Sequence, residues 1–375
     1  MNKAPALRAL RAQAPRPLGL YMMLLKSAEA TAYTRASSAD DSLDIATEAA
    51  ADTALFLKGV RRYRDMPWER SSPHYNAVAS YGRATLWHCG GQGEAVFLVP
   101  SLVNKAYILD LMPDASLTQS LMAAGYSVYM LDWGVPDGQT VLDMDTVIMG
   151  YLLPALEVVA QRHKHPPFVL GYCMGGLLAL AAAAHAPQHI RALVCAATPW
   201  DFGAMPFGSM IAAARPFYEV MLNSTPLLPV DVLQTGFCML DPFGPIRRMQ
   251  AFAEENDDSQ LRRMTAMEDW LADGIPLESP VARTCLFDWY ADNLPHKKQW
   301  QVAGKIIDAA AIQIPTFNIV PKRDVVVPEA AAHALATALP NATTLEVNTG
   351  HIGMMVGRKA NTQVFDPLIQ WLSSQ

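Results

Sequence analysis

Short runs of consecutive apolar residues alternate with longer helix-like segments through most of the chain. Uninterrupted apolar runs of this length are typical of strands buried on both faces of a parallel sheet. Six such runs predict strands, at residues 95–99, 127–133, 168–171, 192–198, 316–320 and 343–348. The intervening and final segments predict helices, at 114–124, 143–162, 175–187, 328–339 and 361–374. The alternation indicates an α/β fold with a mostly parallel central sheet and helices on both faces.

Two long segments lack this alternation. Residues 1–80 are rich in Ala and Arg and predict an N-terminal helical region. Residues 201–300 are rich in Met, Phe, Trp and Pro and predict a largely helical cap inserted over the sheet. The α/β core is therefore expected at 81–200 and 301–375.

Composition narrows the class of protein. The 375 residues are 51% apolar and 17% charged, which suits a large buried core, and no apolar stretch is long enough for a membrane helix. The net charge of −6 does not suggest a partner that is a nucleic acid. The five cysteines are widely spaced without a CxxC pair, so we expect neither disulfides nor structural zinc, but a cytoplasmic location. A basic, then apolar N-terminus faintly resembles a secretory signal, but Pro15 and Pro17 interrupt it.

The strongest candidate for chemistry is the motif GYCMGG at residues 171–176, between a predicted buried strand and an Ala/Leu-rich helix. This is the context of a nucleophile elbow, G-x-S-x-G, in which Cys173 replaces the serine. The positive end of the following helix favours a thiolate, and the Met174 N–H is expected to form half of an oxyanion hole. The alternative is that Cys173 is a small buried apolar residue in a tight turn.

An acid and a histidine should follow such a nucleophile at the ends of later strands. Asp324 follows the strand at 316–320, and His351 follows the strand at 343–348. His351 would take the thiol proton and later protonate the leaving group. Asp324 would orient His351 or act on a second substrate. Asp201, after the strand at 192–198, is a competing candidate for the acid.

From about residue 95 onward, the chain resembles polyhydroxyalkanoate synthases. The resemblance rests on seven stretches in the family's order: PSLVNKAYILDL (100–111), LDWGVPD (131–137), GYCMGG (171–176), TPWDF (198–202), YADNL (290–294), KRDVVVP (322–328) and TGHIG (349–353). DWGVPD and HIGMMVGRKA are most similar to the short, two-component synthases. FLKGVRRYRDMPW, near the N-terminus, does not match these short enzymes.

This resemblance implies an α/β-hydrolase fold with a helical cap and a Cys173–Asp324–His351 triad. It implies an acyltransferase that polymerises 3-hydroxyacyl-CoA through an acyl-cysteine and releases CoA. In the family, the aspartate is thought to activate the substrate hydroxyl while the histidine serves the cysteine. The second oxyanion donor is expected in the loop after the first core strand, at Val103. Lys105 and Arg323 are candidates for contact with CoA phosphates.

The resemblance further implies a homodimer, an accessory synthase subunit and attachment to the surface of a polyester granule in the cytoplasm. Neither a metal nor a dissociable cofactor is expected, because CoA is part of the substrate. The aromatic and methionine side chains of the cap would help exclude water from the acyl-enzyme; they include Phe202, Met205, Phe207, Met210 and Phe217.

Other functions fit the same residues. A thioesterase or intracellular polyester depolymerase would use the same triad, with water attacking the acyl-cysteine. Dienelactone hydrolases also carry Cys in such an elbow, but they are much shorter and lack a long cap. A non-catalytic binding protein is a third alternative, and selective reaction of Cys173 with a thiol reagent near neutral pH would argue against it.

Overall fold

The chain divides into two compact units in the computed structural model, which describes residues 4–35, 38–71 and 73–375. The sheet unit comprises Ser72–Pro229 and Ile275–Gln375. The helical unit comprises Met1–Ser71 and Val230–Gly274. Each unit joins segments that are far apart in the sequence.

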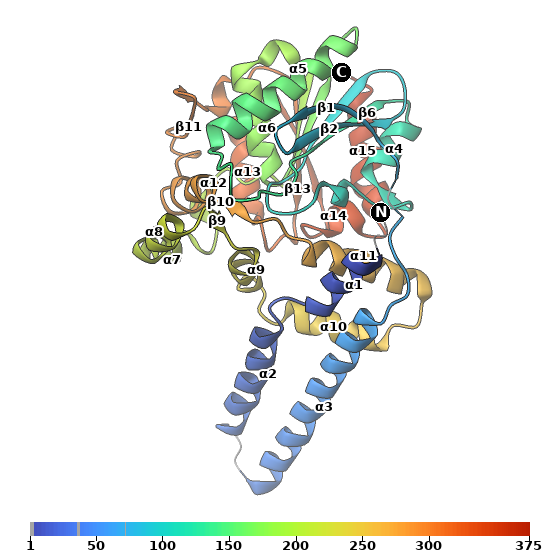
Figure 1. Ribbon diagram of the computed structural model, residues 1–375, viewed down its shortest axis with the longest axis vertical. Coiled ribbons are helices and arrows are strands. Elements are labelled where there is room, and N and C mark those ends of the chain that lie inside the picture. Colours follow the sequence, from blue (N-terminus) through green and yellow to red (C-terminus); the bar gives the residue numbers. More distant parts are fainter. Residues whose placement is uncertain (1–3, 36–37, 72) are drawn as a thin grey trace. The chain divides into compact units, whose positions relative to one another are not determined.

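The sheet unit is built on one central sheet (Figure 1). Among the described residues this sheet has eight strands, in the order β1-β2-β6-β3-β7-β8-β13-β14. The strands from β6 to β14 run parallel, and β2 pairs antiparallel with both β1 and β6. Their bounds are β1 Asn76–Tyr81, β2 Ala84–Gly90, β3 Ala95–Val99, β6 Ser127–Asp132, β7 Phe168–Tyr172, β8 Ala192–Ala196, β13 Thr316–Pro321 and β14 Ala342–Val347.

Helices cover both faces of the sheet, as the alternating pattern predicted. One face carries α5 (Leu153–Arg162), α6 (Met174–His185) and α13 (Glu329–Ala338), and the other carries α4 (Leu117–Ala123) and α15 (Asp366–Leu372) (Figure 1). Because both faces are covered, every residue of β3, β7 and β8 is buried. This explains why these strands are continuous apolar runs in the sequence.

All six predicted strands are confirmed, and five of them both begin and end within one residue of the predicted bounds. Strand β1 lies at the end of the predicted N-terminal helical region, and β2 follows directly after it. Neither strand was predicted. Half of the residues of β1 are exposed, since it is the edge strand, so it lacks the apolar run that marks the inner strands. The prediction that residues 1–80 are helical is therefore wrong for the last part of that range.

The segment predicted as one cap is divided between the two units. Three of its helices stay with the sheet unit: α7 (Gly208–Ala213), α8 (Arg215–Ser224) and α12 (Ser279–Arg283), followed by a π-helical segment, η5 (Thr284–Ala291). Three others, α9 (Val230–Cys238), α10 (Gly244–Glu254) and α11 (Asp258–Ala272), belong to the helical unit. A single cap at 201–300 is therefore not what the structure contains.

The helical unit completes its core with the N-terminal helices α1 (Ala4–Gln13), α2 (Leu18–Tyr33) and α3 (Ala39–Arg64). The core includes Phe56, Tyr63, Met249 and Phe252. Gly59 lets α3 approach α10 closely, because a Cβ there would lie 1.7 Å from the Met249 carbonyl oxygen. Among the described residues, no helix is both long and apolar enough to span a membrane.

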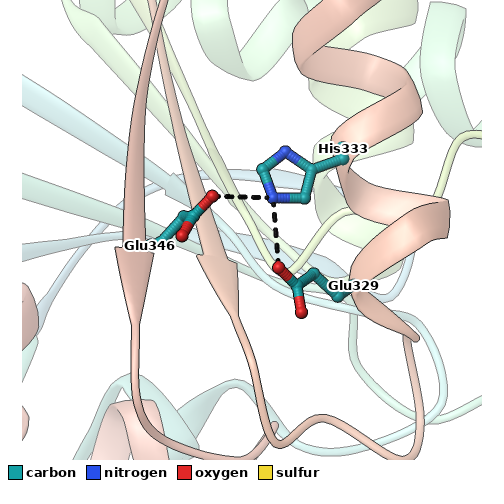
Figure 2. Close-up of side chains that lie close together, drawn as sticks. All are labelled: Glu329, His333 and Glu346. Carbon is teal, nitrogen blue, oxygen red and sulfur yellow. Dashed lines mark ion pairs between the residues drawn. The ribbon is translucent and has the colours of Figure 1, made fainter.

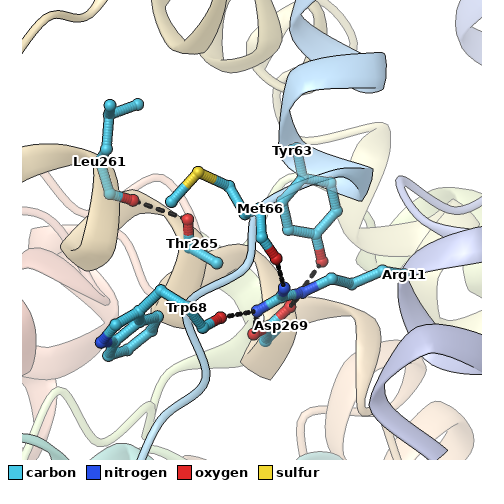
Figure 3. A network of polar contacts seen from close by, with 7 residues as sticks. All are labelled: Arg11, Tyr63, Met66, Trp68, Leu261, Thr265 and Asp269. Atoms are coloured by element: carbon cyan, nitrogen blue, oxygen red, sulfur yellow. Dashed lines mark hydrogen bonds and ion pairs between the residues drawn. The ribbon is translucent and has the colours of Figure 1, made fainter. Parts of the chain in front are cut away.

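A buried ion pair joins α1 to α11 inside this core (Figure 3). Arg11 donates from Nε and a terminal nitrogen to the Asp269 carboxylate, at 2.8 and 2.7 Å. The guanidinium also donates to the carbonyls of Met66 and Trp68, and Tyr63 donates to Asp269 at 3.0 Å. Full pairing of both charges is what makes their burial tolerable.

Candidate active site

Cys173 lies at the sharp turn between β7 and α6. Its φ and ψ angles of 57° and −125° are rare for a residue with a side chain. The surroundings hold this conformation: the Cys173 N–H donates to the Ala196 carbonyl at 2.8 Å, and its own carbonyl accepts from the Gly176 N–H at 2.9 Å. A backbone strained in this way is found mainly at functional sites.

The glycines around Cys173 are required by close packing. A Cβ on Gly171 would lie 2.4 Å from the Gly175 carbonyl oxygen, and one on Gly175 would lie 2.0 Å from the Val99 carbonyl oxygen. A Cβ on Gly176 would lie 1.8 Å from the Thr198 hydroxyl oxygen. The elbow therefore packs closely against the ends of β3 and β8, and this packing fixes the position of Cys173.

Asp324 and His351 meet as predicted from their places after β13 and β14. The His351 Nδ1 lies 2.6 Å from Asp324 Oδ2, and both side chains are almost fully buried. The other oxygen, Oδ1, accepts from the N–H groups of Val326 and Val327, each at 2.8 Å. The carboxylate thus fixes the imidazole, and Cys173 lies close enough to raise the pKa of the imidazole.

Two further contacts hold the histidine loop in place. The Arg323 N–H donates to the Thr349 carbonyl at 2.9 Å, which ties the loop that carries Asp324 to the loop that carries His351. The Tyr172 hydroxyl donates to the His351 main-chain carbonyl at 3.0 Å, and its ring packs against the imidazole with 5.1 Å between centroids. Tyr172 was not singled out from the sequence. A tyrosine at the end of a buried strand, whose hydroxyl needs a partner, was the available signal.

The electrostatics of the site favour a protonated histidine. Burial alone lowers the pKa of His351, but the Asp324 carboxylate and Cys173 outweigh burial and hold that pKa well above its usual range. The arrangement supports nucleophilic catalysis by Cys173, with His351 as the group that exchanges protons.

The two predicted oxyanion donors have different surroundings. Met174 is the first residue of α6, where a helix leaves its N–H groups without partners inside the helix. The Val103 carbonyl accepts from the Ile275 N–H, and its own N–H lies 3.4 Å from the Ser101 hydroxyl oxygen. A hydrogen bond of that length is weak. The assignment of Val103 as the second donor stays a prediction.

Asp201, the competing acid, has other partners. Its carboxylate accepts from the Asn293 side chain at 2.7 Å and from the Gly203 N–H at 2.9 Å. Asn293 in turn accepts from the Phe202 N–H, so it joins the stretches TPWDF and YADNL. Asp201 therefore fixes the backbone between these segments, and Asp324 is the acid that contacts the histidine.

The residues predicted to shield the site fall into two groups. Phe202 and Met205 are buried, and Phe207 is half-buried. Met210 and Phe217 are exposed instead, at 40% and 66%. The Phe202 ring packs edge-on against Tyr290, with 5.1 Å between centroids.

Tyr290 lies close enough to Cys173 and Asp324 to interact with their charges. Burial raises the pKa of the Tyr290 hydroxyl, and Cys173 and Asp324 raise it further. The residue occupies the π-helical segment η5, and π-helical turns are frequent at functional sites. The sequence analysis identified its stretch, YADNL, only through resemblance.

The other four cysteines do not share the environment of Cys173. In the described part of the chain, Cys173 alone of the five is partly exposed. Burial raises the pKa of Cys195 to about 12 and also raises those of Cys89, Cys238 and Cys285. These thiols are poor nucleophiles at neutral pH.

A second cluster of titratable groups lies on α13 and β14 (Figure 2). The His333 Nε2 lies 3.1 Å from a Glu346 oxygen and 3.5 Å from a Glu329 oxygen. Glu346 also pairs with Lys322, which lowers the pKa of the Glu346 carboxyl. The Glu346 carboxylate is thus paired with Lys322, and the cluster is explained as a network of polar contacts within the chain.

A family model described as the alpha/beta hydrolase fold matches residues 96–358. Relatives named "Poly(3-hydroxyalkanoate) polymerase subunit PhaC" are similar over three quarters of the chain. The one from Haloferax mediterranei is 28% identical over 75% of this chain and 58% of its own length. The one from Synechocystis sp. is 28% identical over 75% of this chain and 78% of its own length. The one from Allochromatium vinosum is 29% identical over 75% of this chain and 81% of its own length.

Among solved structures, a monoacylglycerol lipase from Paleococcus ferrophilus is similar, with a TM-score of 0.50 and 18% sequence identity. The match covers 78% of this chain and 98% of the lipase. At that identity the likeness shows the fold alone. The predicted fold class is confirmed by this likeness and by the family model.

Proposed function

The chain belongs to the α/β-hydrolase fold family, and from that premise we propose that it is the catalytic subunit of a poly(3-hydroxyalkanoate) polymerase. It would join 3-hydroxyacyl groups from CoA thioesters into a polyester and release CoA. The observation that carries the proposal is a cysteine at the elbow beside a hydrogen-bonded His351–Asp324 pair, in a chain similar to polymerases of that name.

The first half-reaction would load the enzyme. The Cys173 sulfur attacks the thioester carbonyl while His351 holds the thiol proton. The carbonyl oxygen becomes an oxyanion, which the Met174 N–H, with Val103 as the proposed second donor, would stabilise. When the intermediate collapses, the bond to the CoA sulfur breaks, and His351 returns the proton to CoA. One thioester is exchanged for another, so the step is nearly balanced in energy.

The second half-reaction would extend the polymer. A 3-hydroxyl group attacks the acyl-cysteine, an ester bond forms, and the Cys173 thiol leaves. Both oxygens of Asp324 are occupied, one by His351 and the other by two backbone N–H groups, and the side chain is fully buried. This geometry favours His351 as the base for the hydroxyl, with Asp324 holding it in place. It supports the orienting role of Asp324 over direct activation of the hydroxyl.

The partners follow from the same proposal. The substrate is a 3-hydroxyacyl-CoA, and no dissociable cofactor is required, because CoA is the leaving group. The relatives are named as subunits, which supports a second subunit in the active synthase. Because the product is an insoluble polyester, the enzyme would work at the granule surface in the cytoplasm.

The direct test is to incubate the full chain with 3-hydroxybutyryl-CoA. Free CoA is measured by chromatography, the covalent acyl-enzyme by intact mass, and the product by its solubility and ester content. We expect CoA release, an acyl adduct on Cys173 and polymer. Cys173→Ala should abolish all three, a loss of at least roughly a thousandfold in rate.

Cys89→Ala is the matched control, because it removes a buried thiol away from the elbow and should leave turnover near that of the wild type. Release of CoA with only free 3-hydroxybutyrate would mean that water is the acceptor, and the enzyme would be a thioesterase. The absence of both CoA release and the acyl adduct would contradict the proposal.

A further inference from the structure

The stretch LDWGVPD carries a buried tryptophan, Trp133, directly after β6. Trp133 is 3% exposed, and its indole N–H donates to the Pro100 carbonyl oxygen at 2.9 Å. Pro100 directly follows β3, and the loop after this strand is where the second oxyanion donor is expected. Trp133 therefore ties the end of β6 to residues 100–103, which we call the 100–103 loop.

The backbone around Trp133 is fixed by its neighbours. The Asp132 carboxylate accepts from the Gly134 N–H at 3.0 Å, which closes a tight turn around the tryptophan. Gly134 has a φ of +68°, and a Cβ there would lie 2.4 Å from the Arg83 carbonyl oxygen, so the position requires glycine. The indole is thus held in one place and can support the loop that it contacts.

The 100–103 loop is held at three points. The Pro100 carbonyl accepts from Trp133, and the Val103 carbonyl accepts from the Ile275 N–H at 2.9 Å. The elbow packs against the same loop, because a Cβ on Gly175 would lie 2.9 Å from the Pro100 carbonyl oxygen. One carbonyl therefore meets both the elbow and Trp133. A shift of the indole would move the loop relative to the nucleophile.

The position of this loop matters for the chemistry of acylation. An oxyanion is stabilised only by donors that already lie at hydrogen-bond distance from it, and a misplacement of about 1 Å can cost roughly a hundredfold in rate. The Val103 N–H has only a weak contact within the protein, at 3.4 Å from the Ser101 hydroxyl oxygen, so it is available to a substrate.

We propose that Trp133 is a positioning residue for acylation of the enzyme. Its indole N–H would hold the 100–103 loop at the distance from Cys173 at which the Val103 and Met174 N–H groups face one oxyanion. Trp133 acts through the loop and does not contact the substrate. The inference rests on the proposed function for the identity of the acyl donor, but any activated ester tests the acylation step.

The test compares wild type with Trp133→Phe, which keeps an aromatic ring but removes the N–H. Acylation of Cys173 by 3-hydroxybutyryl-CoA is followed by rapid quenching and intact mass. We expect the maximal acylation rate to fall about ten- to a hundredfold, with little change in the concentration needed for half of that rate. Acylation by p-nitrophenyl acetate should fall by the same factor, because this ester forms the same oxyanion.

Alkylation by iodoacetamide separates positioning of the loop from damage to the elbow. The Cys173 sulfur attacks the CH₂ carbon and displaces iodide, so no oxyanion forms. Trp133→Phe should therefore be alkylated at Cys173 as fast as wild type, with the adduct located by peptide mass. Equal falls in acylation and alkylation would overturn the proposal, since the nucleophile itself would be disturbed. Unchanged acylation would also overturn it.

Trp300→Phe is the matched control. Trp300 is also buried, at 2% exposed, but its indole N–H finds no acceptor within the described part of the chain. This variant loses the same ring volume without breaking a hydrogen bond, so acylation should stay near that of wild type. An equal fall in both variants would overturn the proposal, because loss of volume would then explain the effect.

If Trp133→Phe does not fold, benzothienylalanine at position 133 tests the same bond, because it replaces only the indole N–H with sulfur. We expect a similar fall in acylation, and the absence of a fall would overturn the proposal. Wild type that is acylated by p-nitrophenyl acetate but not by 3-hydroxybutyryl-CoA would refute the proposed function, and the ester would then decide the role of Trp133. A Cys173 that neither compound acylates would overturn both.

Discussion

His351 is the residue at the centre of the candidate site. Its Nδ1 lies 2.6 Å from Asp324 Oδ2, and Cys173 is close enough to raise the pKa of the imidazole. The carboxylate is inaccessible to solvent, so its effect on the imidazole is little screened. Charge and geometry therefore act together, which is typical of a triad.

The stability of the protein should depend on pH through this pair. The pKa of His351 is raised on folding, so the stabilisation is fully present below the unfolded-state pKa of about 6.5 and is lost as pH rises through the raised value. We expect wild type to exceed Asp324→Asn in free energy of unfolding by about 2 kcal/mol near pH 6. The difference should shrink in alkaline solution. Urea unfolding over this pH range measures it, and a pH-independent difference would contradict the assignment.

At the scale of elements, the strand–turn–helix connection between β7 and α6 determines where Cys173, the candidate nucleophile, lies. Its glycines are needed because three separate backbones meet there, from the ends of β3, β7 and β8. The ends of β13 and β14 supply the acid and the histidine, and parallel pairing brings both ends to the same edge of the sheet. The site is thus a consequence of strand order.

Gly176→Ala should damage this joint. The added Cβ would lie 1.8 Å from the Thr198 hydroxyl oxygen, so the helix or the loop after β8 must shift. We expect a loss of about 2–3 kcal/mol in the free energy of unfolding. Gly236→Ala is the control, because that glycine also lies in a helix but has nothing within 4 Å of the added Cβ. It should be neutral or stabilising by up to about 1 kcal/mol, and equal losses would contradict the packing argument.

At the scale of the whole molecule, the chain is organised as two units whose segments alternate along the sequence. Residues 230–274 leave the sheet unit to complete the core around the N-terminal helices. Within that core, the Arg11–Asp269 pair joins segments 258 residues apart. The N-terminal helices are therefore part of a folded unit, although they lie outside the matched family model.

Asp269→Asn should destabilise the helical unit by about 3–5 kcal/mol, because it leaves the buried Arg11 charge without its counter-ion. Asp241→Asn removes the carboxylate of the exposed Arg247–Asp241 pair in the same unit and should cost less than about 1 kcal/mol. Hydrogen exchange, followed peptide by peptide, would locate the loss of protection in residues 4–71 and 230–274. Equal effects of the two variants would argue against the importance of burial.

Sequence alone determined the features that depend on local pattern. The buried strands were predicted because a strand covered on both faces must be apolar throughout, and the elbow because its packing leaves room only for glycine. The order of Cys173, Asp324 and His351 along the chain, each at the end of a predicted strand, identified the three residues that the fold brings together.

Tertiary structure decided what depends on distant segments. The edge strand β1 was missed because exposed residues interrupt its apolar pattern, and β2 was missed because polar residues such as Thr85 and His88 interrupt its apolar run. The choice of Asp324 over Asp201 depended on which carboxylate contacts His351 and which contacts Asn293. The division of residues 201–300 depended on burial against the N-terminal helices. Helical periodicity shows that a helix has an apolar face, but only the folded chain shows which partner covers that face.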